Sequence, residues 1–486
     1  MHHSENIQQN TAGKNIVVNL KNETTVSLRR VLGLGTAVLM VAGSMIGTGV
    51  FKKIVPMAAT GLNETYILTA WIFAGFISLL GALTVAGLAK ATTESGGKYE
   101  YLRLCFGNFI GFLFGWANFI IIGSGAVAAI SFIFSQSLAS FLPVPELFNS
   151  WKDISVAHSI YPFANAGIKI ISIIIIVALT LFNYRGIKNG AVLNNIVTLA
   201  KVSGILFLIF LGIFLSHPSI SSTPGRTIVP PKGLSLFSIF FSVMLSAFWA
   251  YDGFVNVAAI SGEIKNPKRN IPLAIITGVS AVIVLYVLVN FAFMKSVPLS
   301  TLAGLGNGKV AAIVVAQSVL GKTGLLIISS LILLSTLGWL NVGIVAYSRY
   351  YYRMAQENVF FKSASKVHLV YRTPYIALFI PMIWSCVLVI SGSFDVLTDM
   401  TTMASYCFYI MLAIGLIKLK RKGVIKEKIA AYPAAPVLFI LFTLIVIVNT
   451  FINNFERSIT GLGLVLSGIP FYYYFKIKNK HSTSIS

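Results

Sequence analysis

The sequence predicts an all-α membrane protein with twelve transmembrane helices, in two blocks of five followed by two more. Three observations support this prediction. The 486 residues are 56% hydrophobic and only 10% charged, whereas soluble domains carry about 25% charged residues. Twelve hydrophobic runs are long enough to cross a bilayer, which takes about 17–25 residues. Two of them, the first and the sixth, are interrupted near their centres by residues that do not suit a continuous membrane helix.

The expected spans follow one another with polar connections between them. They cover residues 32–56, 65–90, 106–142, 166–183, 190–216, 236–260, 272–294, 324–350, 373–392, 396–417, 433–453 and 458–475. The apolar segment 308–321 is too short to cross, and we expect it to form a helix at the outer surface. The chain therefore divides into a tail (1–30), one membrane domain (31–475, with blocks 31–216 and 235–418 and a final pair 433–475) and a second tail (476–486).

The positive charge lies mainly between the spans. The net charge is +23, and most lysines and arginines fall on connections that share a side with the N-terminus, which predicts that both termini are cytoplasmic. This placement argues against nucleic-acid binding. The first thirty residues lack an apolar core, so we expect a retained tail and no signal peptide. The expected location is the plasma membrane, or the inner membrane of a Gram-negative cell.

The first interruption is the segment Gly43–Gly49, which holds three glycines, Ser44 and Thr48. In hydrocarbon, each unmade backbone hydrogen bond costs several kcal/mol, so a helix breaks there only where protein or a water-filled cavity replaces the lost partners. The backbone N–H groups that start the following half-helix favour an anion. The segment is therefore typical of a membrane transporter.

The second interruption is Phe248–Gly253, at the centre of the sixth span. An aspartate such as Asp252 costs about 2.5–3.5 kcal/mol at mid-membrane. Interruptions at corresponding positions of two halves indicate a binding site at the midplane of an inverted-repeat transporter. Because each block has five spans, an odd number, the second block must be inverted relative to the first.

Both interruptions resemble signatures of the amino acid–polyamine–organocation (APC) transporter superfamily. Gly43–Phe51 (GSMIGTGVF) is similar to its first-helix motif, while Trp249–Phe254 (WAYDGF), Gly262–Pro267 (GEIKNP) and Asn270–Pro272 (NIP) are similar to its sixth-helix block. The L-amino acid transporters and their bacterial relatives are the nearest branch, and the resemblance covers residues 30–475. It implies a LeuT-like fold and secondary active transport of L-amino acids by alternating access.

The resemblance also implies a substrate site. The substrate carboxylate would meet the backbone N–H groups of Thr48 and Gly49, and its ammonium group the carbonyls of Met45, Trp249 and Asp252, with the Trp249 ring as a gate. The whole expected set is Ser44, Met45, Ile46, Gly47, Thr48, Gly49, Phe248, Trp249, Ala250, Tyr251 and Asp252. Contributors to side-chain specificity are expected among Asn118, Trp339, Asn341 and Tyr406. A neutral substrate is expected, because no charge partner for its side chain is evident.

Three charged residues have two interpretations each. Lys201 lies deep in the fifth span, where an ionisable residue indicates function; it is either a built-in cation for coupling or a structural lysine bonded to first-helix carbonyls. For the Asp252 side chain, a hydrogen bond to a freed backbone amide is favoured over proton transfer. Glu263 is either an inner gate or an ordinary interfacial ion pair.

The chain departs from the superfamily pattern at Lys52 and Lys53. Their side chains either snorkel to the outer interface or bias the entrance against cationic substrates. The loop 143–165 has no cysteine, so no disulfide-linked heavy chain is expected. The three cysteines of the chain, Cys105, Cys386 and Cys407, lie outside the predicted outer loops, which argues against a disulfide framework.

Several other functions remain as alternatives. The runner-up is a polyamine or other organic-cation permease, which would need more acidic residues within the spans. A membrane-embedded enzyme and a channel are remote alternatives, since the spans offer only Asp252 and Lys201 as deep charged groups. The sequence has no phosphate-binding loop and no metal-ligand spacing, so neither a cofactor nor ATP is expected. Lys201 argues against sodium coupling, while exchange, proton symport and uniport stay open.

Overall fold

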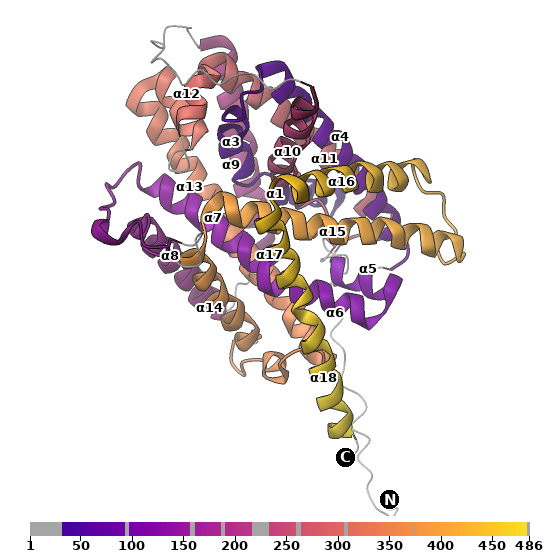
Figure 1. The fold of residues 1–486 in the computed structure, drawn as a ribbon. Helices are drawn as coiled ribbons and strands as arrows, with labels where there is room; N and C mark the ends of the chain where they lie inside the picture. Colours follow the sequence, from indigo (N-terminus) through magenta and orange to yellow (C-terminus); the bar gives the residue numbers. More distant parts are fainter. Residues whose placement is uncertain are drawn as a thin grey trace, which may run out of the picture.

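The computed structural model describes residues 32–92, 97–155, 161–185, 190–215, 233–258, 264–305, 310–371 and 373–483. Within these residues the regular secondary structure is helical, apart from one isolated backbone bridge between Leu32 and Ile264, which confirms the predicted all-α class (Figure 1). Nine of the described helices are long and apolar enough to cross a membrane, and α1 and α14 are shorter apolar helices.

The first block is built from nine helices and two π-helical turns. The first span comprises α1 (Leu34–Met45), α2 (Gly49–Lys52) and α3 (Ile54–Ala58); α4 (Glu64–Leu88) is the second span, and α5 (Gly97–Phe106) leads into the third. The third span comprises α6 (Asn108–Ala117), a π turn (Asn118–Ile122) and α7 (Gly123–Leu138); α8 (Ala166–Tyr184) and α9 (Gly190–Phe210), extended by a π turn (Leu211–Leu215), follow.

The second block repeats this pattern. It comprises α10 (Gly233–Tyr251), α11 (Pro267–Ser296), α12 (Leu299–Gly304), α13 (Ala311–Gln356), α14 (Tyr375–Ser391) and α15 (Phe394–Arg421), and the final pair comprises α16 (Ala434–Asn453), α17 (Phe455–Leu466) and α18 (Gly468–Thr483). Gly321 has non-helical angles (φ 59°, ψ −141°) and separates the predicted short helix from the eighth span. The last helix continues to Thr483, beyond the predicted end at residue 475.

Helix packing relates the two blocks. α4 packs against α11, α7 against α13 and α8 against α14, so that each of these helices meets its counterpart from the other block. The broken spans exchange neighbours in the same way, since α1 packs on α11 and α10 on α4. Figure 1 shows α8 and α14 together at one edge, with α1 and α10 near the middle. This reciprocal packing is what a five-plus-five inverted repeat requires.

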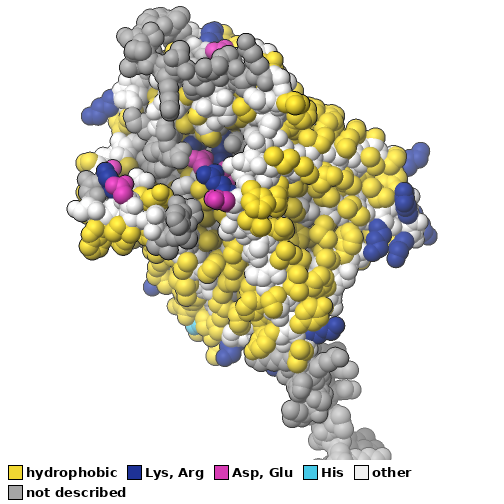
Figure 2. All heavy atoms as spheres, viewed as in Figure 1, with side chains coloured by type: hydrophobic (Ala, Val, Ile, Leu, Met, Phe, Trp, Pro, Cys, Tyr) yellow, Lys and Arg dark blue, Asp and Glu magenta, His cyan; other side chains and the backbone are white. Residues whose placement is uncertain are grey.

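The outside of the bundle is apolar across its middle. Large hydrophobic side chains such as Ile72, Phe182 and Ile383 are about half exposed or more on span helices. Figure 2 shows hydrophobic side chains over much of the visible face, with most lysines and arginines toward its margins and one small charged group near its centre. Such a surface suits lipid, because a soluble monomer rarely exposes a contiguous apolar patch of this size. The protein is an integral multi-pass membrane protein.

Candidate functional site

The first helix break lies between α1 and α2. The backbone leaves the helical region at Ile46 (φ −70°, ψ 83°), and α2 begins at Gly49. The N–H of Gly47 turns back to the Met45 carbonyl at 2.7 Å. The break therefore falls inside the predicted segment, although Gly43 and Ser44 still belong to α1.

The second break follows α10. Gly253 has φ 113°, a value that side-chain-bearing residues rarely adopt. Its N–H donates to Oδ1 of Asp252 at 2.7 Å. Asp252 thus bonds a backbone amide freed by the break, which is the role the sequence favoured for this side chain.

The two breaks touch each other. The Ser44 hydroxyl lies 2.9 Å from the Gly253 carbonyl oxygen. A Cβ atom on Gly253 would lie 2.4 Å from the carbonyl oxygen of Ser44, and one on Gly49 would lie 2.7 Å from Cα of Ala250. Glycine is therefore required at both positions for the two half-helices to approach.

A cavity opens between the breaks. Seven of the eleven predicted substrate residues line it: Ser44, Met45, Gly47, Thr48, Gly49, Trp249 and Asp252. Further lining comes from Lys98 after the second span, from Asn118 and Ile122 of the π turn, and from Asn256, Trp339, Tyr347 and Thr401, among others. A π turn inside a helix is frequent at functional sites, because it re-aims side chains locally.

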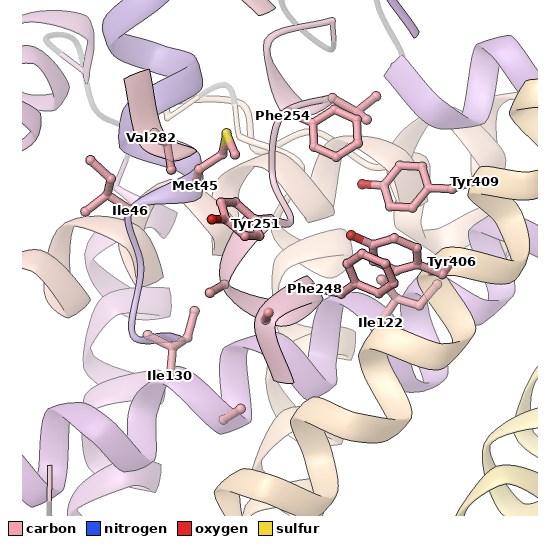
Figure 3. Packing of buried hydrophobic residues seen from close by; sticks show 14 of the residues in the cluster. Met45, Ile46, Ile122, Ile130, Phe248, Tyr251, Phe254, Val282, Tyr406 and Tyr409 are labelled. Carbon is pink, nitrogen blue, oxygen red and sulfur yellow. The ribbon is translucent and has the colours of Figure 1, made fainter. Parts of the chain in front are cut away.

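The other four predicted residues, Ile46, Phe248, Ala250 and Tyr251, are buried in the core away from the cavity. Phe248 stacks on Tyr406 with ring centroids 4.4 Å apart, as Figure 3 shows. The Tyr251 hydroxyl donates to the Trp71 carbonyl at 3.1 Å. These residues hold the second break in place.

The expected specificity residues divide in the same way. Asn118 and Trp339 line the cavity. Asn341 instead accepts a hydrogen bond from Asn183 at 2.8 Å, and Tyr406 packs on Phe248. Lys98, Asn256, Tyr347 and Thr401 also line the cavity and were not predicted, since polar residues in a connection or within a span carry no local signal of which cavity they face.

The polar groups of the first break differ in their availability. Oγ1 of Thr48 is buried and has no hydrogen-bond partner among the described residues. The Met45 carbonyl already accepts from the Tyr286 hydroxyl at 2.8 Å and from the Gly47 N–H. Thr48 therefore has unused hydrogen-bonding capacity beside the cavity, whereas Met45 would have to share or release a bond to accept another donor.

The family profile described as amino acid permease matches residues 32–470. The chain belongs to the amino acid permease family. This confirms the expected APC superfamily membership and the twelve-span fold that goes with it. Amino acid transport is the activity of this family.

Individual relatives cover nearly the whole permease. It is 28% identical to the serine/threonine exchanger of Bacillus subtilis (strain 168) over 92% of this chain and 97% of that protein. It is 26% identical to the b(0,+)-type amino acid transporter 1 of Mus musculus over 93% of this chain and 89% of that protein. It is also 28% identical to the cystine/glutamate transporter of Homo sapiens, over 94% and 87% respectively. The amino acids in these relatives' names differ in side-chain charge, since serine and threonine are neutral and glutamate is acidic.

Lys201 of the permease contacts the end of α1. Its Nζ donates to the Gly43 carbonyl at 3.1 Å, and the side chain is only 3% exposed. In an unbroken helix that carbonyl would accept from the N–H of Gly47, which here bonds Met45 instead. Lys201 thus ties α9 to the broken helix without lining the cavity. Glu263 lies outside the described residues.

The permease buries Lys52 and Lys53, with 0% and 1% of their surface exposed. Lys53 Nζ donates to Asp395 at 3.1 Å, to Thr398 at 2.7 Å and to Asp399 at 3.4 Å. Lys52 Nζ donates to Gln136 at 2.9 Å. The snorkelling interpretation is therefore wrong for these two side chains, because both are buried. Carboxylates of α15 stabilise the Lys53 ammonium group, and Gln136 of α7 accepts from Lys52.

A second ion-pair network joins α5 to the end of α13. The Tyr99 hydroxyl donates to Glu357 at 2.5 Å. Arg103 pairs with Glu100 at 2.8 Å, and Arg353 pairs with Glu357 at 3.1 Å. Lys53 and its partners Asp395, Thr398 and Asp399 form the Lys53 cluster. The 25-residue helix α4 starts just after α3, near this cluster, and ends shortly before α5. Because a helix rises about 1.5 Å per residue, the cluster and the network around Glu357 lie near opposite ends of the bundle.

Proposed function

We propose that this permease is a secondary active transporter that moves neutral L-amino acids across the plasma membrane by alternating access, independently of sodium. The observation that supports it most is the contact between the two helix breaks around one cavity. Such paired half-helix ends suit a zwitterion, because N-terminal ends favour its carboxylate and unwound carbonyls favour its ammonium group.

The substrate main chain would bind across the breaks. Its carboxylate would meet the N–H groups of Thr48 and Gly49, and the Thr48 hydroxyl, which no described residue bonds, supplies a further donor. Its ammonium group would meet the carbonyls of Trp249 and Asp252, of which Trp249 accepts only a long bond of 3.4 Å from the Asp252 N–H. The Met45 carbonyl would contribute by sharing or releasing one of its bonds. The Trp249 ring lines the cavity and serves as the gate over the bound molecule.

The Lys53 cluster is suited to close the outer path. The last turn of α15 carries Lys418, Lys420 and Arg421, and its connection to α16 carries Lys422, Lys426 and Lys428, so we place this end, with both termini, in the cytoplasm. Lys53 then belongs to the outer half of the bundle. The Phe394 ring lies 5.2 Å from Lys53 Nζ and 6.3 Å from the Trp249 ring, and so connects the cluster with the cavity wall. Access from outside requires that the pairs with Asp395 and Asp399 separate.

The network around Glu357 would act at the inner end, where Glu263 remains a further gate candidate. Lys201 would couple the site to helix movement, because it holds the carbonyl end of α1. The resemblance to the superfamily implies that its ammonium group falls near the site where sodium-driven members bind their ion, which supports sodium independence. Whether a proton accompanies the substrate is decided by the experiment below. Asp252 is the only acidic residue in the described lining of the cavity, which weighs against a polyamine carrier.

Transport in liposomes tests this function. Purified protein would be reconstituted, preloaded with one neutral amino acid and challenged with labelled amino acids in sodium-free buffer. Uptake that depends on the internal amino acid supports exchange, and uptake that depends on a pH gradient supports proton symport. Failure to transport or bind any amino acid would overturn the proposal.

A further inference from the structure

Lys98 is a buried cation beside the substrate cavity. It is the second residue of α5, which is otherwise a connection between spans, yet its side chain is only 7% exposed. Nζ donates to the Tyr409 hydroxyl at 3.0 Å, and Lys98 lines the same cavity as Asp252. A lysine exposed on a loop would be solvated by water, and neither the bond to Tyr409 nor the position beside the cavity would be expected of it.

Tyr409 connects this cation with Asp252. Its hydroxyl accepts the hydrogen bond from Lys98 and donates one to Oδ1 of Asp252. Figure 3 shows the Tyr409 oxygen directed toward the extended segment that follows Tyr251. The resulting series of hydrogen bonds from Lys98 through Tyr409 to Asp252 joins α5, α15 and the second break.

These hydrogen bonds from Lys98 through Tyr409 to Asp252 also balance the charge of the cavity. Among the described residues that line it, Lys98 and Asp252 are the charged ones, one of each sign. A carboxylate at this depth without a compensating cation would be costly, and it would offer a strong partner to a substrate with a positive side chain. Lys201 cannot take over this function from its position, because its Nζ bonds Gly43 outside the lining.

We propose that Lys98 is a specificity-determining residue: by neutralising Asp252 through Tyr409, it keeps the cavity neutral and rejects amino acids with cationic side chains. This inference rests on the proposed transport function and names the substrate class of the same site. Specificity of this kind is a difference between two affinities, so it is measured as a ratio.

The test compares Lys98→Met and Lys98→Arg with the wild type in liposomes, using labelled serine, arginine and glutamate. Lys98→Met should raise the ratio of arginine to serine transport at least about tenfold, which corresponds to ~1.4 kcal/mol, and Lys98→Arg should keep the wild-type ratio. Lys268→Met is the matched control, since Lys268 is exposed and pairs with Glu427 away from the cavity.

A second variant covers the case in which Lys98→Met does not fold. Asp252→Asn leaves Lys98 as the unbalanced charge and should shift preference toward glutamate. An unchanged arginine-to-serine ratio in folded Lys98→Met, no gain for glutamate in Asp252→Asn, or a wild type that prefers arginine would overturn the inference. If the wild type carries serine, these outcomes leave the transport function intact; if it carries no amino acid, the proposed function itself fails.

Discussion

The hydroxyl of Ser44 lies 2.9 Å from the carbonyl oxygen of Gly253, and this contact joins two helix breaks that are 209 residues apart in the chain. Each break leaves backbone groups without helical partners. Their contact satisfies part of this need inside the protein, which is the condition for broken helices at membrane depth. The cavity between them follows from the same geometry.

Gly253→Ala should disrupt this contact. The new methyl group would lie 2.4 Å from the Ser44 carbonyl oxygen, and the positive φ costs about 1–3 kcal/mol for a residue other than glycine. We expect a lower thermal unfolding midpoint and uptake reduced more than about tenfold. Gly463→Ala in α17 is the control, since a Cβ there meets no described atom within 4 Å. Equal uptake by both variants would contradict the close approach.

Lys201→Ala should impair transport more than folding. It leaves the Gly43 carbonyl unpaired at a cost of about 1–3 kcal/mol and releases α9 from the end of α1. We expect normal expression and at least about tenfold slower uptake. Lys295→Ala is the matched control, because Lys295 also donates to a carbonyl, that of Ile213, but on an exposed side chain. Wild-type uptake in folded Lys201→Ala would refute the coupling role.

Thr48→Val should weaken substrate binding without weakening the fold. The Thr48 hydroxyl is buried and has no hydrogen-bond partner in the described part of the chain, so replacing it with an apolar group of similar shape removes a desolvation cost. We expect KM to rise about tenfold while the unfolding midpoint stays equal or increases, and Thr48→Ser to behave as the wild type. A lower midpoint with unchanged KM would show that the hydroxyl is structural.

Lys53→Met should open the outer path. It leaves Asp395 and Asp399 without their buried cation, which destabilises the closed arrangement. In a background without native cysteines, Ala126→Cys in the cavity lining would report access. A membrane-impermeant thiol reagent should label it about tenfold faster from outside in the Lys53→Met protein.

Lys152→Met is the control for that experiment, because Lys152 is exposed on the connection between α7 and α8. Equal labelling rates with lysine or methionine at position 53 would mean that the cluster is a static support. A slower rate would mean that the pairs hold the path open.

Much of the architecture follows from local sequence. Hydropathy places the spans because a bilayer leaves few alternatives to a helix, and the glycines of Gly43–Gly49 locate the first break to within a few residues. The direction of individual side chains at the second interruption was harder to predict. Phe248 and Tyr251 lie in the last turn of α10 and face the core, because a helix that is buried on several sides is apolar all round and its sequence does not show which face meets the cavity.

The charged residues depended on partners distant in sequence. The carboxylates that hold Lys53 come from α15, 342 and 346 residues further along the chain, so the dipeptide alone could not distinguish burial from snorkelling. Lys98 belongs to a connection that returns to the cavity, and its partner Tyr409 is 311 residues away. Only the tertiary fold brings these groups together.

The central claim is that the two breaks bind the main-chain groups shared by all α-amino acids. Competition in liposomes loaded with a neutral amino acid tests it most directly, using alanine, its amide without the carboxylate, and propionate without the amino group. We expect alanine to compete with labelled substrate and both analogues to fail. Equal competition by either analogue would contradict a site built from the ends of two broken helices.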